Sequence, residues 1–334
     1  MATLRNRRSA GPLAELPALV APDSFKGTFS AREVAAAIAA GLRAGGREAH
    51  EMPVADGGEG TMEAIVTTLE GELRTISASD PLGRPVEASF ALLEDGRAIV
   101  EAAQASGLGL VDEGERDAWG SSTRGTGELI AAAVEAGAER VIVTVGGSAT
   151  TDGGAGALEA LEEAGVSVEL DVLCDVRVPF EQAPSVFGPQ KGADPAMVKR
   201  LEERLHELAG RFNRDPRGEP MTGAAGGLSG GLWAQHGARL QHGASFVLDT
   251  IGFDEHMRRS AFVVTGEGRI DSQTLQGKIV GELATRCRQG GVACHAVVGK
   301  NELDEFSARI LDLASLTEAT TLNELEDAGR RLAG

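Results

Sequence analysis

Five glycine-rich loops carry most of the side chains that could do chemistry in this chain of 334 residues. They combine glycine with acidic, hydroxyl and lysine side chains, at residues 21–27, 55–61, 146–156, 187–192 and 265–278. Glycine lets backbone N–H groups approach a ligand, and a helix that follows adds roughly half a positive charge at its N-terminus. Glycine is also frequent, at 45 residues. The loops therefore indicate binding of a small phosphorylated or anionic molecule.

The motif Asp-Gly-Gly-x-Gly occurs twice, at residues 56–60 and 152–156, each time ahead of a predicted helix. For Asp56 or Asp152 alone, the simpler interpretation is a helix cap. An aspartate at this place also suits Mg²⁺ coordination or the orientation of a hydroxyl group. The paired glycines after each aspartate favour a functional loop.

Lysine is rare, with five residues against 27 arginines, so arginine occupies most ordinary surface positions. Lys26, Lys191, Lys278 and Lys300 each adjoin a glycine, whereas Lys199 does not. A compact ammonium group beside exposed backbone N–H groups is a phosphate-binding arrangement. The alternative, a lysine on a surface loop, has most weight for Lys300.

Alternating strands and helices are expected to position these loops. Apolar runs predict strands at residues 16–21, 50–55, 141–145, 261–265 and 293–298, with a weak one at 313–316. Helices are predicted after the capping box at 30–33, around 62–69, and at 127–136, 153–164, 196–211, 277–287, 302–311 and 322–332. Such alternation makes a parallel sheet, and ligands bind at the carboxyl ends of its strands.

A change of pattern in the middle of the chain predicts a second domain. Residues 87–93 and 97–102 flank the turn 94–96 as in an antiparallel hairpin. The expected fold is α/β: a Rossmann-like doubly wound parallel-sheet domain built from both chain ends, with a second α/β domain inserted. The expected boundaries are 16–72 and 251–334 for the first domain and 73–250 for the second, with residues 1–15 a disordered extension.

Composition excludes several classes of function. A net charge of −18 argues against nucleic acid or an anionic membrane as the main partner. Three cysteines without paired spacing indicate a reducing compartment, and residues 1–17 have no apolar stretch typical of a signal peptide. A cytoplasmic protein is expected. The first predicted strand leads into Pro-Asp-Ser, not Gly-x-Gly-x-x-Gly, which disfavours a dinucleotide-binding dehydrogenase.

In this order, the loops resemble those of the bacterial two-domain glycerate kinases. The matching segments are residues 21–26, 53–61, 122–130, 146–156, 187–193, 223–228 and 265–278. The resemblance implies phosphorylation of D-glycerate by ATP with Mg²⁺, favours 2-phosphoglycerate as product, and leaves a homodimer open. The chain departs from the family between residues 156 and 172, where a few tens of residues are missing. Thr151, Val178 and Val280 also replace family residues.

Phosphoryl transfer needs positioning and charge neutralisation more than covalent chemistry. The predicted catalytic residues are Lys26, Asp152, Asp271 and Lys278. The predicted substrate- or phosphate-binding residues are Asp23, Ser24, Asp56, Gly57, Gly58, Glu59, Gly60, Gly146, Gly147, Ser148, Gly153, Gly154, Lys191, Gly266, Glu267 and Arg269. Arg269 would clamp the substrate carboxylate. Asp56 and Asp271 are the candidate Mg²⁺ ligands, and the sequence does not separate that role from the base that accepts the hydroxyl proton.

Two rival functions remain at this point. A kinase for another small hydroxy acid would have the same mechanism, and the altered second domain favours it. A non-catalytic sensor of nucleotide or anion would need no acid–base carboxylate beside its phosphate loop. Asp271 and Lys278 therefore argue against a sensor.

Overall fold

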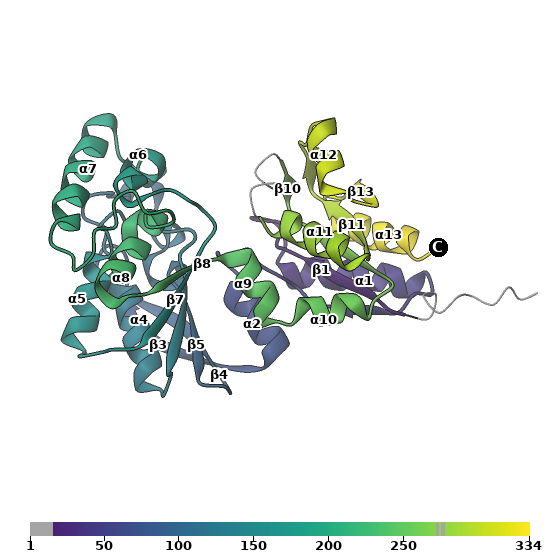
Figure 1. Cartoon of the computed structure of the whole chain (residues 1–334), viewed down its shortest axis with the longest axis horizontal. Coiled ribbons are helices and arrows are strands. Elements are labelled where there is room, and N and C mark those ends of the chain that lie inside the picture. The colour runs from purple at the N-terminus through teal and green to yellow at the C-terminus, as the bar shows by residue number, and fades with distance from the viewer. Residues whose placement is uncertain (1–15, 272–273, 275–277) are drawn as a thin grey trace, which may run out of the picture. The chain divides into compact units, whose positions relative to one another are not determined.

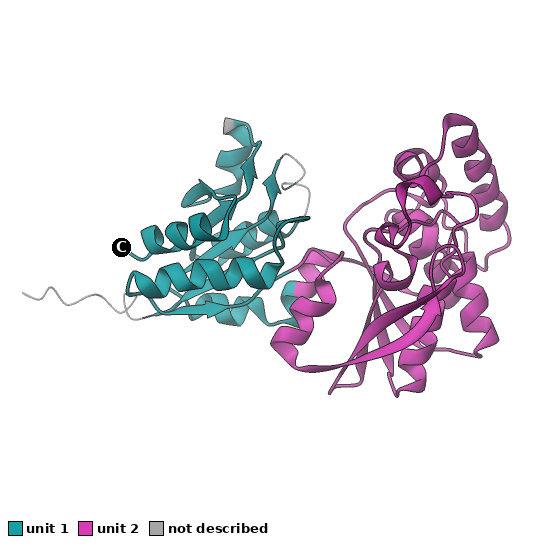
Figure 2. Cartoon of the chain, turned by 180° about the vertical axis from the view of Figure 1, so that it is seen from behind, with its two compact units in different colours: residues 1–54, 248–334 teal, residues 55–247 magenta. Residues whose placement is uncertain are grey.

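The structure is a computed structural model that describes residues 16–271, 274 and 278–334. The extension predicted for residues 1–15 lies outside this range, as do Gln276 and Gly277 of the fifth loop. The chain divides into two compact units, unit 1 (residues 1–54 and 248–334) and unit 2 (residues 55–247) (Figure 2). The predicted fold class is confirmed: both chain ends build one parallel-sheet unit, and an α/β unit is inserted between them.

Unit 1 contains a five-stranded sheet in the order β13-β11-β9-β1-β2, with every neighbouring pair parallel. Its strands are β1 (Ala18–Pro22), β2 (Ala49–Glu51), β9 (Phe262–Gly266), β11 (Ala293–Val298) and β13 (Ser315–Glu318). Its helices include α1 (Ala31–Ala44), α10 (Phe253–Arg258), α11 (Ile279–Gly290), α12 (Glu305–Leu311) and α13 (Leu322–Leu332). Strands β10 (Arg269–Ile270) and β12 (Lys300–Asn301) form a separate parallel pair.

Helices cover both faces of this sheet, as a doubly wound fold requires (Figure 1). Helices α1 and α13 pack against each other and on the face that carries Val20, Val264 and Val297. Side chains alternate along a strand, so the neighbouring residues point to the opposite face, where α11 contacts β9 and β11. Cys287 of α11 reaches Cys294 of β11 on that second face.

The predicted capping box starts α1 and thereby fixes the end of the loop after β1. The Ser30 hydroxyl accepts the Glu33 N–H at 3.2 Å, and the Glu33 carboxylate accepts the Ser30 N–H at 2.8 Å. Ile38 and Leu42 then follow on the buried face. The helix ends at Gly45, as the sequence predicts.

Unit 2 contains a six-stranded sheet in the order β3-β4-β5-β6-β7-β8. Its strands are β3 (Gly71–Ser79), β4 (Pro85–Leu93), β5 (Arg97–Glu101), β6 (Arg140–Thr144), β7 (Glu169–Cys174) and β8 (Arg239–His242). Strands β3, β4 and β5 pair antiparallel, and β5 to β8 pair parallel. The predicted hairpin is therefore confirmed as β4 and β5, with Gly96 at a φ of 79° in its turn.

The α-helices that begin in unit 2 are α2 (Thr61–Leu69), α3 (Ala103–Ser106), α4 (Arg124–Glu135), α5 (Ala155–Glu163), α6 (Ala183–Phe187), α7 (Pro195–Ala209), α8 (Leu228–His236) and α9 (Gly243–Thr250). Its 3₁₀ turns are η2 (Leu108–Leu110), η3 (Glu113–Glu115), η4 (Phe180–Gln182), η5 (Pro189–Lys191) and η6 (Ala224–Gly227). Within the described residues, no helix has the length and apolar content to cross a bilayer.

Sheet order decides where the helices of unit 2 lie. The strands β5 to β8 follow one another in one direction, and right-handed crossovers then place α4, α5 and α8 on one face. Leu129, Val143 and Leu228 belong to the core on that face. Helix α2 contacts β3, β4 and β5, as α4 also does. Residues 55–72, which the sequence analysis placed in the first domain, make these contacts within unit 2.

Candidate functional site

Unit 1 has a topological switch point between β1 and β9. From β1 the chain passes to β2 on one side, whereas β9, β11 and β13 follow one another on the other side. Open α/β sheets bind ligands at the carboxyl ends of the strands that flank such a point. The loops 23–27 and 266–271 start there, and the Asp23 N–H donates to the Gly266 carbonyl at 2.8 Å.

Glycine lets these two loops meet. A Cβ on Gly266 would lie 2.1 Å from the carbonyl oxygen of Val297. A Cβ on Gly268 would lie 3.2 Å from the Phe25 Cα and 3.4 Å from the Lys26 nitrogen. The predicted residues Asp23, Ser24, Lys26, Gly266 and Glu267 are thus brought to one sheet edge. Of these, Asp23 and Glu267 are buried and Lys26 is exposed.

Thr274 connects the Glu267 carboxylate to the backbone of Asp271. The Thr274 hydroxyl donates to the Glu267 Oε1 at 2.9 Å and accepts the Asp271 N–H at 3.3 Å. The Thr274 N–H donates back to the Asp271 carbonyl at 3.0 Å. Asp23 accepts the N–H of Ser24 at 2.6 Å. Through Thr274, the backbone of Asp271 is therefore held close to the Glu267 carboxylate.

Two further predicted cations are Arg269, within this loop, and Lys278, after it. Arg269 belongs to β10, is largely exposed, and has its Nη1 3.7 Å from Glu302. Glu302 also pairs with Lys300 at 2.5 Å. Lys278 is the N-cap residue of α11 and is half-buried. Its ammonium group therefore stands at the positive end of a helix of unit 1.

In unit 2, the loop 56–60 closes over the carboxyl ends of three strands. A Cβ on Gly57, whose φ is 93°, would lie 2.4 Å from the Gly243 Cα after β8 and 3.3 Å from Leu173 of β7. A Cβ on Gly146, after β6, would lie 2.9 Å from the Gly58 Cα. Two of the predicted loops are therefore in direct backbone contact at this edge.

Several backbone N–H groups of the loop 56–60 are already used within the protein. Asp56 accepts the Gly58 N–H at 3.0 Å. The buried carboxylate of Glu101, at the end of β5, accepts the Met62 N–H at 2.9 Å and also binds the Gly60 N–H. The N–H groups of Gly58 and Gly60 were predicted to bind phosphate, and in the structure carboxylates of the protein accept them.

Sequence reasoning missed Glu101. Burial raises the pKa of its carboxyl group, and the nearby charge of Glu59 raises it further, against the lowering effect of the Met62 and Gly60 N–H groups. Its signal in the sequence is an acidic residue at the end of the apolar run 97–102. That place corresponds to the carboxyl edge of a strand.

The N-cap residue of α5 is Gly154 and not Asp152, contrary to the simpler interpretation, but the Asp152 carboxylate still accepts N–H groups at the start of this helix. Its Oδ2 accepts the Thr123 N–H at 2.9 Å, the Thr123 hydroxyl at 2.8 Å and the Gly156 N–H at 3.1 Å. Its Oδ1 accepts the Gly154 N–H at 3.1 Å. The Gly153 N–H donates to the Gly226 carbonyl at 3.0 Å. The half of the loop that contains Gly153 and Gly154 is thus engaged in fixing α4, α5 and η6.

Lys191 lies beneath the other half of that loop and not on the surface. It is 2% exposed, and its ammonium group donates to the Ser148 Oγ at 2.9 Å and the Thr150 carbonyl at 2.5 Å. Burial lowers the pKa of Lys191 to about 7, against the charge of Asp152, which raises it. These two bonds use two of the three protons of the ammonium group, and the burial of Lys191 separates it from solvent, so the direct phosphate contact predicted for it stays a prediction.

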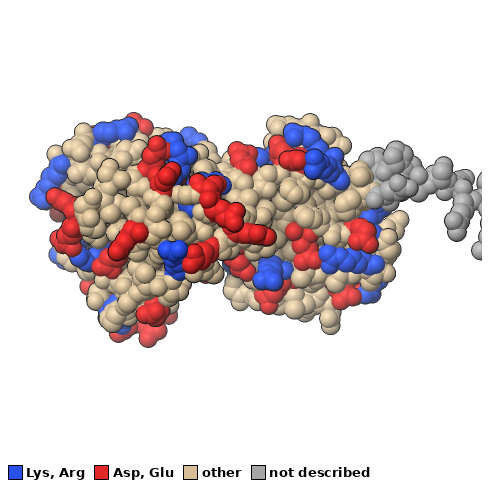
Figure 3. Space-filling model, turned by 90° about the horizontal axis from the view of Figure 1, so that it is seen from below, with Lys and Arg blue, Asp and Glu red and all other residues tan. Residues whose placement is uncertain are grey.

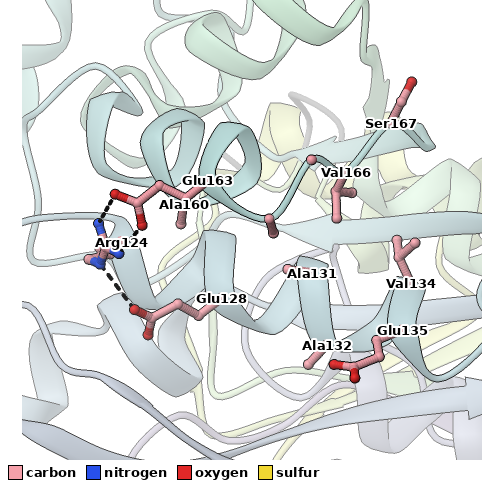
Figure 4. Close-up of a pocket in the computed structure, with 12 residues that line it drawn as sticks. Arg124, Glu128, Ala131, Ala132, Val134, Glu135, Ala160, Glu163, Val166 and Ser167 are labelled. Carbon is pink, nitrogen blue, oxygen red and sulfur yellow. Dashed lines mark hydrogen bonds and ion pairs between the residues drawn. The ribbon is translucent and has the colours of Figure 1, made fainter.

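The charge distribution and the groove described next do not point to a further binding site at these loops. On the face shown in Figure 3, basic side chains stand among acidic ones. A groove of about 810 Å³ lies between α4, α5 and the turn 164–167, and Arg124 bridges Glu128 and Glu163 at its rim (Figure 4). The predicted site residues do not line this groove.

Comparison with known proteins gives a consistent result. The model of the glycerate kinase family matches residues 18–167 and 162–328. The chain is 41% identical over 303 residues to a glycerate kinase of Bacillus subtilis, covering 78% of each chain. It is 40% identical over 301 residues to a glycerate 2-kinase of Escherichia coli, covering 78% of this chain and 79% of the relative. A crystal structure assigned as glycerate kinase 2 from Salmonella typhimurium LT2 superimposes with a TM-score of 0.82 at 33% identity, covering 95% of this chain and 97% of the other.

The same comparisons locate a shortened segment. The alignment with a glycerate kinase of Halalkalibacterium halodurans, 37% identical, spans 367 positions and covers 94% of this chain, so the relative has residues without a counterpart here. The two stretches that match the family model meet at residues 162–167. This is the end of α5 and the short turn to β7, beside the groove of Figure 4.

Proposed function

The chain belongs to the glycerate kinase family, and on that premise we propose that it transfers the γ-phosphoryl group of ATP to D-glycerate with Mg²⁺. The relatives named glycerate kinase support the reaction class. The relative named glycerate 2-kinase supports the 2-hydroxyl group as acceptor, and hence 2-phosphoglycerate as product.

The observation that carries the proposal at residue level is the switch point of unit 1. Lys26 and Lys278 lie on the loops and helix that leave this edge, and a lysine ammonium neutralises the charge that spreads over the transferring phosphoryl oxygens. The N-terminus of α11 adds its partial positive charge beside Lys278. In the proposed mechanism, these groups bind and orient the phosphoryl group.

The candidates for the base that accepts the hydroxyl proton are narrowed by their hydrogen bonds. The two oxygens of Asp152 already accept four, so moving this carboxylate toward a substrate would break its bonds to Thr123, Gly154 and Gly156. We therefore assign Asp152 to holding these segments and keep Asp56 and Asp271 as the proposed candidates for the base. Arg269, at the exposed end of β10, is proposed to bind the substrate carboxylate.

We propose that Asp271 would help to hold a magnesium ion that substrate oxygens complete. Mg²⁺ in kinases is held by one or two carboxylates together with substrate phosphates, and Glu267 on the same loop would be a second carboxylate for it. Asp56, the other predicted ligand, belongs to unit 2 and stays a candidate. Among the described residues, no group of three His, Cys, Asp or Glu side chains could hold a metal ion without such help. When bound, the ion would neutralise charge on the β- and γ-phosphates.

The test is release of ADP by the purified chain with ATP, Mg²⁺ and D-glycerate, with L-glycerate, glycerol and no acceptor as controls. We expect turnover with D-glycerate and none with the controls. Turnover only with another small hydroxy acid would contradict the proposed acceptor and support the rival kinase that the shortened turn after α5 favours. Because cysteines 174, 287 and 294 are free and buried, we also propose a cytoplasmic protein.

A further inference from the structure

The turn formed by Gly146, Gly147 and Ser148 keeps its backbone donors available. The Gly147 carbonyl accepts the Leu108 N–H at 2.8 Å, and the next N–H, of Ala149, donates at 2.9 Å to a carbonyl after β5. No described residue accepts the N–H groups of the three turn residues themselves. Successive N–H groups in such a turn form an anion-binding concavity.

The contrast with the other loops is informative. Carboxylates of the protein already occupy the N–H groups of Gly58 and Met62 in one loop and of Gly154 and Gly156 in the other. By contrast, no carboxylate among the described residues accepts the backbone N–H groups of the turn 146–148. An anionic oxygen from a ligand has the chemistry to take that place.

Lys191 orients the one side chain of this turn that can donate. Its ammonium group donates to the Ser148 Oγ at 2.9 Å, which occupies an acceptor site of that hydroxyl group. A hydroxyl group has one proton, and no described acceptor takes it from Ser148. The bond from Lys191 therefore leaves the Ser148 proton for another acceptor. The second bond, to the Thr150 carbonyl at 2.5 Å, holds the backbone after the turn.

The residues around Lys191 hold its ammonium group in place. The turn η5 ends at Gly192, whose φ of 90° and contact with Arg116, 3.1 Å from an added Cβ, leave room only for glycine. Asp152 is the acidic group whose charge acts on Lys191, and it acts on Arg204 of α7 as well. Lys191 is thus a buried lysine that contacts this turn through Ser148.

We propose that the Gly146–Gly147–Ser148 turn binds an anionic oxygen group of a substrate through its N–H groups and the Ser148 hydroxyl, and that Lys191 is the positioning residue that orients this hydroxyl. The proposal deepens the proposed function, on which it rests. The glycerate carboxylate and the phosphates of ATP share this chemistry, and the test distinguishes them.

The test measures binding by calorimetry, with D-glycerate, Mg·ATP and inorganic phosphate as separate probes. The proteins are the full-length wild type and the variants S148A, K191M and S148A/K191M. The control K199M removes a lysine charge at an exposed position of α7. Far-UV circular dichroism and the melting temperature check folding, and S148A keeps the test valid should K191M fail to fold.

We expect S148A to weaken one of the two substrates about tenfold or more, the usual effect of losing a hydrogen bond to a charged group. A loss confined to D-glycerate assigns the turn to the carboxylate, and a loss confined to Mg·ATP and phosphate assigns it to a phosphate. K191M should weaken the same substrate, and the double variant should bind no more weakly than S148A alone, because both changes remove one interaction. K199M should bind as the wild type does.

Unchanged affinity of S148A for all three probes would overturn the proposal. Effects of K191M and S148A that simply add would overturn the positioning role, since Lys191 would then stabilise the fold independently of Ser148. These results are separable from the proposed function: wild-type protein that binds the probes but shows no turnover contradicts the reaction, whereas the anion site is decided by S148A alone.

Discussion

Replacing Lys191 by methionine should change how the stability of unit 2 depends on pH. The folded protein holds this lysine with a pKa of about 7, against 10.5 for an ordinary lysine, because its ammonium group is buried. Between these values, the unfolded chain carries a proton that the folded chain lacks. Stability therefore rises with pH in this window, by up to about 1.4 kcal/mol per pH unit for one proton.

From pH 7 to pH 9, the free energy of unfolding of the wild type should thus rise by about 2 kcal/mol relative to K191M, which has no titrating group there. Below pH 7 both states are protonated, and the difference between the two proteins should level off. Urea unfolding followed by tryptophan fluorescence measures this directly, since Trp119 and Trp233 both lie in unit 2. The exposed-site variant K199M should follow the wild type. A difference between wild type and K191M that is the same at pH 7 and pH 9 would refute the reasoning.

Three substitutions test other parts of the account. Lys278→Ala should lower kcat/KM by about 10²-fold or more, roughly 2.7 kcal/mol of transition-state stabilisation, while Lys199→Ala leaves it unchanged; a near-wild-type value for the first would remove Lys278 from the mechanism. Gly146→Ala should lower the free energy of unfolding by about 1–3 kcal/mol, because the added Cβ would lie 2.9 Å from the Gly58 Cα. The control Gly109→Ala should have little effect, since its Cβ would meet nothing within 4 Å. Equal effects of the two substitutions would contradict the close contact. Asp152→Ala should lower the free energy of unfolding by about 2–4 kcal/mol, because the donors of Thr123, Gly154 and Gly156 would lose their acceptor. An inactive variant with the stability of the wild type would contradict this structural role and favour a catalytic one.

The sequence predicts best those elements whose burial is uniform. Strands β1, β6, β9 and β11 each lie between two parallel neighbours, and most of their residues are apolar and buried. The capping box of α1 is a local signal, and the structure confirms it. Both kinds of element depend on near neighbours in the chain, so the pattern of residues suffices.

Elements with a mixed environment were missed for physical reasons. Strand β3 has the sequence GELRTISAS, with several exposed positions, and pairs on one side only, at the end of the sheet. Strand β8 is short and polar. Strand β7 is buried along most of its length, but Glu169 and the buried Asp171 interrupt its apolar run, so the pattern does not predict it. Helix α8 is buried around most of its circumference and contains two glycines, so it lacks an amphipathic pattern.

The sequence indicates which loops are glycine-rich, but it does not predict which hydrogen bonds each residue in these loops makes. Asp152 is engaged by a residue 29 positions away, Met62 by one 39 positions away, and Lys191 by one 43 positions away. A glycine-rich pattern shows that backbone donors are near a sheet edge. It does not show which donors the protein itself already uses, and that distinction separates the turn 146–148 from the other loops.

Phosphorus NMR of the product formed from ATP, Mg²⁺ and D-glycerate tests the central claim most directly. The account predicts ADP together with a phosphomonoester whose phosphorus couples to the single proton of carbon 2, as in 2-phosphoglycerate. Coupling to two equivalent or similar protons would place the phosphoryl group on carbon 3 and contradict the proposed position. ATP left unchanged, or converted only to ADP and inorganic phosphate, would contradict the kinase reaction itself.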